Sequence, residues 1–154
     1  MRYLGIDWGA KRIGLAYGDE LGLATPLPAL VQREEVARWD ALAQVVAARR
    51  IQHLVVGYPL NMDDTVGFKA REVDAFIGQL AERFALPVTR QDERLTTYAA
   101  EEGLRAAKKR DKRDRKVRAS GEVDSRAAVL ILQDYLDVQM VPSEPLDLIE
   151  ENHE

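Results

Sequence analysis

The first thirty residues alternate short runs of β-type apolar side chains with glycine and proline. Residues 2–7 and 12–18 predict two strands joined by a turn at Gly9, where the missing Cβ permits a tight backbone. Residues 21–32 predict a third, irregular strand. Pro26 and Pro28 cannot donate hydrogen bonds to a neighbouring strand, so this strand belongs at an edge or contains a break. The pattern therefore predicts an antiparallel three-stranded meander.

From about residue 34 the hydrophobic period becomes helical and then alternates between helix and strand. Residues 34–50 and 67–84 predict two amphipathic helices. Their apolar stripes are Val36, Trp39, Leu42, Ala43 and Val46 in the first, and Val73, Phe76, Ile77, Leu80 and Phe84 in the second. The continuously apolar residues 53–57 predict a strand buried on both faces, 58–65 a loop, and 87–91 another short strand.

The last third of the chain predicts helices around 97–107 and 123–136, separated by a basic segment at 105–118. A meander followed by alternating helices and strands is typical of an α/β domain. We expect a mixed five-stranded sheet, with the meander joined by two parallel strands and helices on both faces. One domain should span 1–137, and the acidic tail 138–154 should be partly disordered.

Composition narrows the possible chemistry. The 154 residues contain no cysteine, which excludes disulfides, thiolate metal sites and a cysteine nucleophile. No apolar run approaches the roughly 18 residues of a membrane span, and the N-terminus lacks a signal-peptide pattern, so cytoplasm is the default location. The basic segment holds nine Lys/Arg and two Asp, or +7, in a chain of net charge −4, which leaves −11 for the rest. Such asymmetry indicates an anionic partner that binds at one place.

Three carboxylates at the ends of predicted elements are candidates for a divalent metal site. Asp7 ends the first strand, Asp92 or Glu93 follows the strand at 87–91, and Asp124 begins the last helix. Each has a structural alternative, namely a turn residue for Asp7, first-turn helix electrostatics for Asp92 or Glu93, and a helix cap for Asp124. With only two histidines in the chain, a site of carboxylate and water would suit Mg²⁺ or Mn²⁺ better than zinc.

Basic and polar residues give the candidate substrate contacts. The basic segment should bind phosphates with steep salt dependence and without reading bases, although a charge run can also be a solvated helix face. Tyr58 is a weaker candidate and can equally be core packing. The full set of expected contacts is Arg12, Asn61, Lys69, Arg94, Lys108, Lys109, Arg110, Lys112 and Arg113.

Four motifs together resemble the YqgF/RuvX family. They are GIDWGAKRIGLA at 5–16, GYPLNMD at 57–63, DERLTT at 92–97 and VDSRAAVLILQDYL at 123–136, and they cover nearly the whole chain to about residue 137. Two departures affect local loop geometry and the placing of basic groups. Asp64 stands where the second motif usually has glycine, and a lysine often found just before the glycine of the last motif is absent before Gly121.

The resemblance implies a ribonuclease H-like fold, shared with RuvC-type resolvases. It also implies that Asp7, Glu93 and Asp124 are the catalytic acids, which selects Glu93 over Asp92. The implied activity is metal-dependent hydrolysis of phosphodiester bonds, in maturation of the 5′ end of pre-16S ribosomal RNA or, as the alternative, in Holliday junction resolution.

Two other classes of function are compatible with parts of the sequence. The Gly-x-Asp-x-Gly turn also resembles the first phosphate loop of the actin and sugar-kinase superfamily, but those proteins enclose ATP between two such lobes and this chain has room for one. A nucleic-acid-binding accessory factor without catalysis would use the basic segment equally well. Three carboxylates beside phosphate would not help a pure binder, so we favour the nuclease. Monomer and homodimer both remain open.

Overall fold

The computed structural model describes residues 1–59, 67–93 and 125–140. Within these ranges no helix is long and apolar enough to cross a membrane. The helix predicted at 97–107, the basic segment and the tail beyond residue 140 lie outside the described residues. The elements, in chain order, are β1 (Tyr3–Asp7), β2 (Ile13–Gly18), β3 (Thr25–Leu30), α1 (Glu35–Ala48), β4 (His53–Tyr58), α2 (Phe68–Phe84), β5 (Val88–Asp92) and α6 (Arg126–Met140).

The five strands form one mixed sheet in the order β3-β2-β1-β4-β5. The β1–β2 and β2–β3 pairs are antiparallel, whereas β4 is parallel to β1 and β5 is parallel to β4. This arrangement confirms the predicted meander and its two parallel additions. β3, which carries Pro26 and Pro28, lies at the edge of the sheet as expected.

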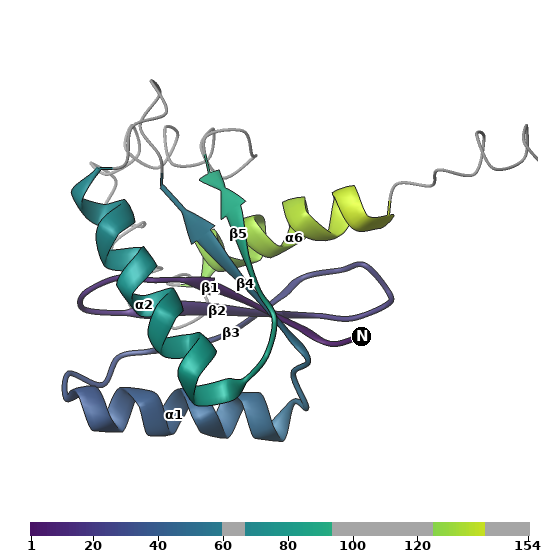
Figure 1. Ribbon diagram of the computed structural model, residues 1–154. Coiled ribbons are helices and arrows are strands. Elements are labelled where there is room, and N and C mark those ends of the chain that lie inside the picture. The colour runs from purple at the N-terminus through teal and green to yellow at the C-terminus, as the bar shows by residue number, and fades with distance from the viewer. Residues whose placement is uncertain (60–66, 94–124, 141–154) are drawn as a thin grey trace, which may run out of the picture.

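Helices cover both faces of the sheet (Figure 1). Leu4 and Ile6 of β1 belong to a core cluster shared with α1 and α2. Val55 of β4 and Ala16 of β2 belong to a second cluster, shared with α6 on the other face. Successive strand residues point to opposite faces, so this division fixes the face on which each strand-end side chain lies.

Three predictions need correction. In α1 the side chains of Val36 and Ala43 are exposed, because the buried arc centres on Leu42 and reaches toward Ala41 and Val45 instead. The third strand begins at Thr25 and not at residue 21, because a turn precedes it in which Gly22 has φ 78° and donates its N–H to Asp19 O. The last helix begins at Arg126 and continues to Met140, past its predicted end at residue 136.

α6 lies unusually close to the centre of the sheet. A Cβ on Gly5 of β1 would lie 2.6 Å from Leu132 Cβ and 3.0 Å from Ala128 O. A Cβ on Gly18 of β2 would lie 2.7 Å from Leu136 Cδ1. Such distances are shorter than normal carbon contacts, so only glycine at these positions allows the helix to pack at this depth.

This packing gives a prediction about stability. Gly5→Ala should lower the free energy of unfolding by about 1–3 kcal/mol, the usual cost of forcing an extra carbon into a packed core. Gly78→Ala adds the same carbon within α2, where nothing lies within 4 Å of the new Cβ. The control should be neutral or stabilising by up to about 1 kcal/mol. Urea denaturation of the two variants measures the difference, and equal stability would refute the close-packing argument.

Candidate metal site at the carboxyl edge of the sheet

The carboxyl ends of the parallel strands β1, β4 and β5 meet at one edge of the sheet (Figure 1). Asp7 is the last residue of β1 and lies opposite Gly14 of β2. The β1–β4 register pairs Ile6 with Val56, and one further step brings Asp7 level with Gly57. Asp7 therefore ends the central strand of the sheet, at the kind of edge where open α/β sheets bind ligands.

The side chain of Asp7 lies on the face covered by α6. Gly5 faces this helix, as its close approach to Leu132 shows, and Asp7 is two residues further along the same strand. Asp7 is partly buried.

Glu93 joins Asp7 on this face. It directly follows β5 and is buried, with 8% of its surface exposed. Its Oε1 lies 2.5 Å from the position that a Cβ on Gly57 would occupy. The carboxylate of Glu93 thus lies over Gly57, in space that a side chain on β4 would fill. Because Asp7 is level with Gly57 on the neighbouring strand, the two predicted acids lie on the same face at the same end of the sheet.

Asp92 lies on the opposite face. It is paired with Tyr58, whose ring belongs to the core under α1 and α2. The Tyr58 hydroxyl donates a 2.7 Å hydrogen bond to Asp74 of α2, which also accepts two from Arg90 at 3.0 and 3.2 Å. The hydrogen bond to Asp74, burial and the charge of Asp74 all raise the pKa of Tyr58, so its hydroxyl remains a donor. Tyr58 is therefore a packing residue that joins β4 to α2.

The third predicted acid, Asp124, lies outside the described residues, but its neighbour Ser125 is fixed firmly. Ser125 is fully buried, and its Oγ accepts a 3.1 Å hydrogen bond from Leu15 N–H and donates a 2.5 Å hydrogen bond to Leu27 O. These bonds attach the start of α6 to β2 and β3, where the register between the two strands shifts.

The donor set at this edge suits a hard divalent cation. Carboxylate oxygens are the ligands that Mg²⁺ and Mn²⁺ prefer, and Gly57 leaves room for that of Glu93 beside β4. In the part of the chain that the structure describes, no group of three acidic or histidine side chains is close enough to hold a metal ion. Asp7 and Glu93 are the two predicted ligands within that part.

The predicted substrate contacts are distributed around the same edge. Arg12 lines a basic pocket at the β1–β2 turn. Lys69 is exposed in the first turn of α2. The other predicted contacts lie outside the described residues and remain predictions, namely Asn61, Arg94, Lys108, Lys109, Arg110, Lys112 and Arg113.

Sequence reasoning missed two residues that build this site. The role of Ser125 depends on partners 110 and 98 positions away, which no local pattern reveals. Gly57 leaves room for Glu93 only because β4 lies next to β5, so its role can be recognised only once the strand order is known. The strand alternation that separates Asp92 from Glu93, in contrast, is visible in the sequence.

Comparison with known proteins identifies the family of the chain. The family model described as "RuvX: Holliday junction resolvase" matches residues 1–138. A protein of Opitutus terrae named "Putative pre-16S rRNA nuclease" is 53% identical over 146 residues, which is 94% of this chain and 97% of that protein. A protein of the same name from Picosynechococcus is 42% identical over 143 residues, covering 92% and 96% of the two chains.

Solved structures show the same fold at low sequence identity. RuvC of T. thermophilus, in complex with a Holliday junction substrate, superposes with a TM-score of 0.52 at 16% identity, covering 91% of this chain and 96% of that one. The Fowlpox virus resolvase in complex with Holliday junction DNA gives 0.53 at 12% identity, covering 91% and 99%. These likenesses confirm the ribonuclease H-like fold. The family model matches the chain from β1 to α6, and relatives 53% and 42% identical align with more than nine-tenths of it. The protein therefore belongs to the RuvX family.

Proposed function

We propose that the protein is a divalent-metal-dependent nuclease that matures the 5′ end of pre-16S ribosomal RNA. The observation that carries this proposal is the position of Glu93 over Gly57, on the same α6 face of the sheet as Asp7. Family membership and relatives named as pre-16S rRNA nucleases support the substrate. Resolution of four-way DNA junctions is the second candidate, which the description of the family model favours.

Asp7 and Glu93, with Asp124 as the third acid, would hold Mg²⁺ or Mn²⁺. When bound, such ions activate water, orient the phosphodiester and neutralise charge on the leaving oxygen, as in two-metal nucleases. The protein's own contribution is rigidity and charge. Asp7 is fixed by the central strand, and Glu93 is held over Gly57 in a buried position. Basic residues around the edge would bind the flanking phosphates.

Neutral replacements of the two acids give the first test. Asp7→Asn and Glu93→Gln should each lower the cleavage rate roughly 10²-fold or more, the scale seen when one charge-stabilising group is lost from an active site. Binding should be kept or improved because a negative charge is removed. Asp92→Asn is the matched control, since it removes the same charge from the opposite face of the sheet.

The assay would use end-labelled substrates with Mg²⁺ or Mn²⁺: an RNA spanning the precursor 5′ end, single-stranded DNA and a four-way DNA junction. Preferential cutting of the RNA would support the proposed substrate, and preferential cutting of the junction would favour resolution. Salt-sensitive binding by a folded protein that cuts none of them would instead indicate an accessory factor. An unchanged rate in Asp7→Asn would show that the metal-site assignment is wrong.

A second test acts on Glu93 without changing any charge. Gly57→Ala places a Cβ where the Glu93 carboxylate lies, so the carboxylate must move. Cleavage should fall by about tenfold or more while the protein stays folded, because small displacements of catalytic groups are costly. Gly78→Ala, in open space on α2, is the control and should cleave as wild type does. Full activity in Gly57→Ala would argue against a role for Glu93 at this position.

The basic segment gives a third test. Replacing Lys108, Lys109 and Arg110 together with Ala should weaken substrate binding. If each residue contacts one phosphate, the slope of log K against log salt should become shallower by up to about 3. Affinity measured between low and high salt checks this expectation, and an unchanged slope would show that the segment does not contact the substrate.

A further inference from the structure

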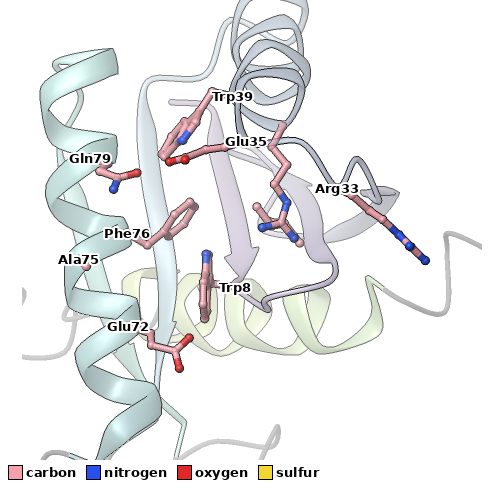
Figure 2. Close-up of a pocket in the computed structure, with 10 residues that line it drawn as sticks. Trp8, Arg33, Glu35, Trp39, Glu72, Ala75, Phe76 and Gln79 are labelled. Atoms are coloured by element: carbon pink, nitrogen blue, oxygen red, sulfur yellow. The ribbon is translucent and has the colours of Figure 1, made fainter.

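A pocket lies on the face of the sheet opposite to Asp7 and Glu93. It has a volume of about 380 Å³, which is in the range of small-ligand sites, and lies between α1 and α2 at the end of β1. Among the described residues, three aromatic side chains line it: Trp39 of α1, Phe76 of α2 and Trp8, which directly follows β1 (Figure 2). The Phe76 ring centroid is 5.4 Å from that of Trp39 and 6.1 Å from that of Trp8.

The three rings differ in accessibility. Trp39 and Phe76 are core residues with 7% and 6% of their surface exposed. Trp8 is only partly buried, and it lines the pocket just beyond the end of β1. An indole held against a packed floor, with part of its surface open to solvent, is a stacking platform for a planar ligand.

Charged and polar side chains surround the aromatic part of the pocket, and they include Arg33 and Arg38 as well as hydrogen-bond acceptors. Figure 2 shows Glu72 and Gln79 of α2 on one side and Glu35 of α1 on the other. Carboxylates accept hydrogen bonds from amino groups, and acidic side chains pair with the exocyclic amino group of cytosine in nucleic-acid complexes. The carboxylates of Glu35 and Glu72 therefore favour a base that carries an amino group.

A basic pocket adjoins the aromatic one. It has a volume of about 510 Å³ and is lined by the β1–β2 turn and the segment before α1, through Ala10, Lys11, Arg12, Val31 and Arg33. Arg33 lines both pockets, and in Figure 2 its side chain extends away from the aromatic rings. Among the residues that the structure describes, the lining of the basic pocket includes three basic side chains and no acidic one, so its charge is complementary to phosphate.

The two pockets are held in a fixed relation by Arg38. Its Nη2 donates hydrogen bonds to Gly9 O at 3.1 Å and to Ala10 O at 2.8 Å, which ties the β1–β2 turn to α1. The turn is tight, since a Cβ on Gly9 would lie 2.7 Å from Arg12 O. A ligand with a phosphate at the turn and a base against Trp8 therefore meets a preformed surface.

We infer that these pockets together bind one unstacked nucleotide of the substrate strand, with its base against Trp8 and its phosphate on Lys11, Arg12 and Arg33. This inference rests on the proposed nuclease function. Asp7 ends β1 and Trp8 directly follows it, with Trp8 packed on the opposite face of the sheet, so a nucleic-acid strand that crosses the end of the sheet at the β1–β2 turn reaches both. The substrate is then single-stranded at that nucleotide, because a paired base cannot enter the pocket.

Tryptophan fluorescence tests the inference directly, because both tryptophans of the chain line the pocket. The probes are dC12, dT12 of equal length and charge, a 12-base-pair duplex, and free CMP, all at low salt. We expect dC12 to quench the emission and to bind several-fold more tightly than dT12. Trp39→Phe should keep the quenching and Trp8→Phe should lose it. The duplex should give little quenching, and CMP should bind far more weakly than dC12.

Affinity measurements with labelled dC12 test the two halves of the site. Trp8→Leu should weaken binding by about fivefold or more, the effect of losing one base–aromatic stack. Lys11→Ala combined with Arg33→Ala should weaken binding and flatten its salt dependence. Arg2→Ala combined with Arg50→Ala is the control, because it removes two exposed charges from the opposite edge of the sheet. Circular dichroism establishes that each variant is folded.

Photocrosslinking tests the wild-type chain without mutation. A 5-iodocytosine base in dC12 should crosslink to Trp8, located by mass spectrometry of the peptides. Any of three results would overturn the inference: crosslinks found only at residues other than Trp8, quenching that persists in Trp8→Phe, or equal affinity for dC12 and dT12. Binding of CMP as tight as that of dC12 would indicate a site for free nucleotides and would overturn it too. If the wild-type protein cleaves its substrate but shows neither quenching nor a crosslink at Trp8, the proposed nuclease function stands and the nucleotide site is rejected. If it shows quenching and the crosslink but cleaves no substrate, the nucleotide site stands and the nuclease function is rejected.

Discussion

The close packing of α6 against the sheet is the constraint on which the site depends. Three neighbouring strands present glycine to this helix: Gly5 on β1, Gly18 on β2 and Gly57 on β4. At Gly5 and Gly18 the missing side chain is replaced by the leucines of α6. At Gly57 the space is shared between Ile131 of α6 and the carboxylate of Glu93. Glycines on the strands therefore allow α6 to pack closely on the sheet, and Gly57 also leaves room for the buried Glu93 near the end of β1.

The sheet separates two kinds of chemistry by its two faces. The α6 face carries Asp7 and Glu93, which suit a divalent cation and a reacting phosphate. The α1/α2 face carries the indole of Trp8, and basic groups adjoin it at the β1–β2 turn. Because successive residues point to opposite faces, Asp7 at the end of β1 lies on one surface and Trp8, which follows it, on the other. A single strand of nucleic acid crossing this edge would be held on one face and cut on the other.

Much of the fold was predictable because its elements have strong local signals. The strand alternation around Leu4 and Ile6, the prolines of β3 and the helical stripe of α2 all correspond to what the structure shows. The sequence also places Asp92 and Glu93 on opposite faces, and the structure agrees. The exposure of Val36 was not predicted. An amphipathic pattern shows which side of a helix is apolar, but it does not show which residues at the border of that side contact the sheet.

The remaining features arise from contacts between segments distant in sequence, which no local pattern encodes. Ser125 bonds to β2 and β3, and Arg38 bonds to the β1–β2 turn. The nucleotide pocket forms where α1, α2 and the end of β1 meet, so it cannot be predicted from the presence of Trp8 in the sequence. The metal-ligand roles of Asp7 and Glu93 still rest on their geometry and on family membership.

The most direct test of the account is a titration of the protein with Mn²⁺, followed by the electron paramagnetic resonance signal of the free ion. We predict saturable binding to the wild-type chain, weakened by about tenfold or more in Asp7→Asn and in Glu93→Gln, and unchanged in Asp92→Asn. This result would establish the two acids on the α6 face as metal ligands. Equal Mn²⁺ affinity in all four proteins would contradict the account.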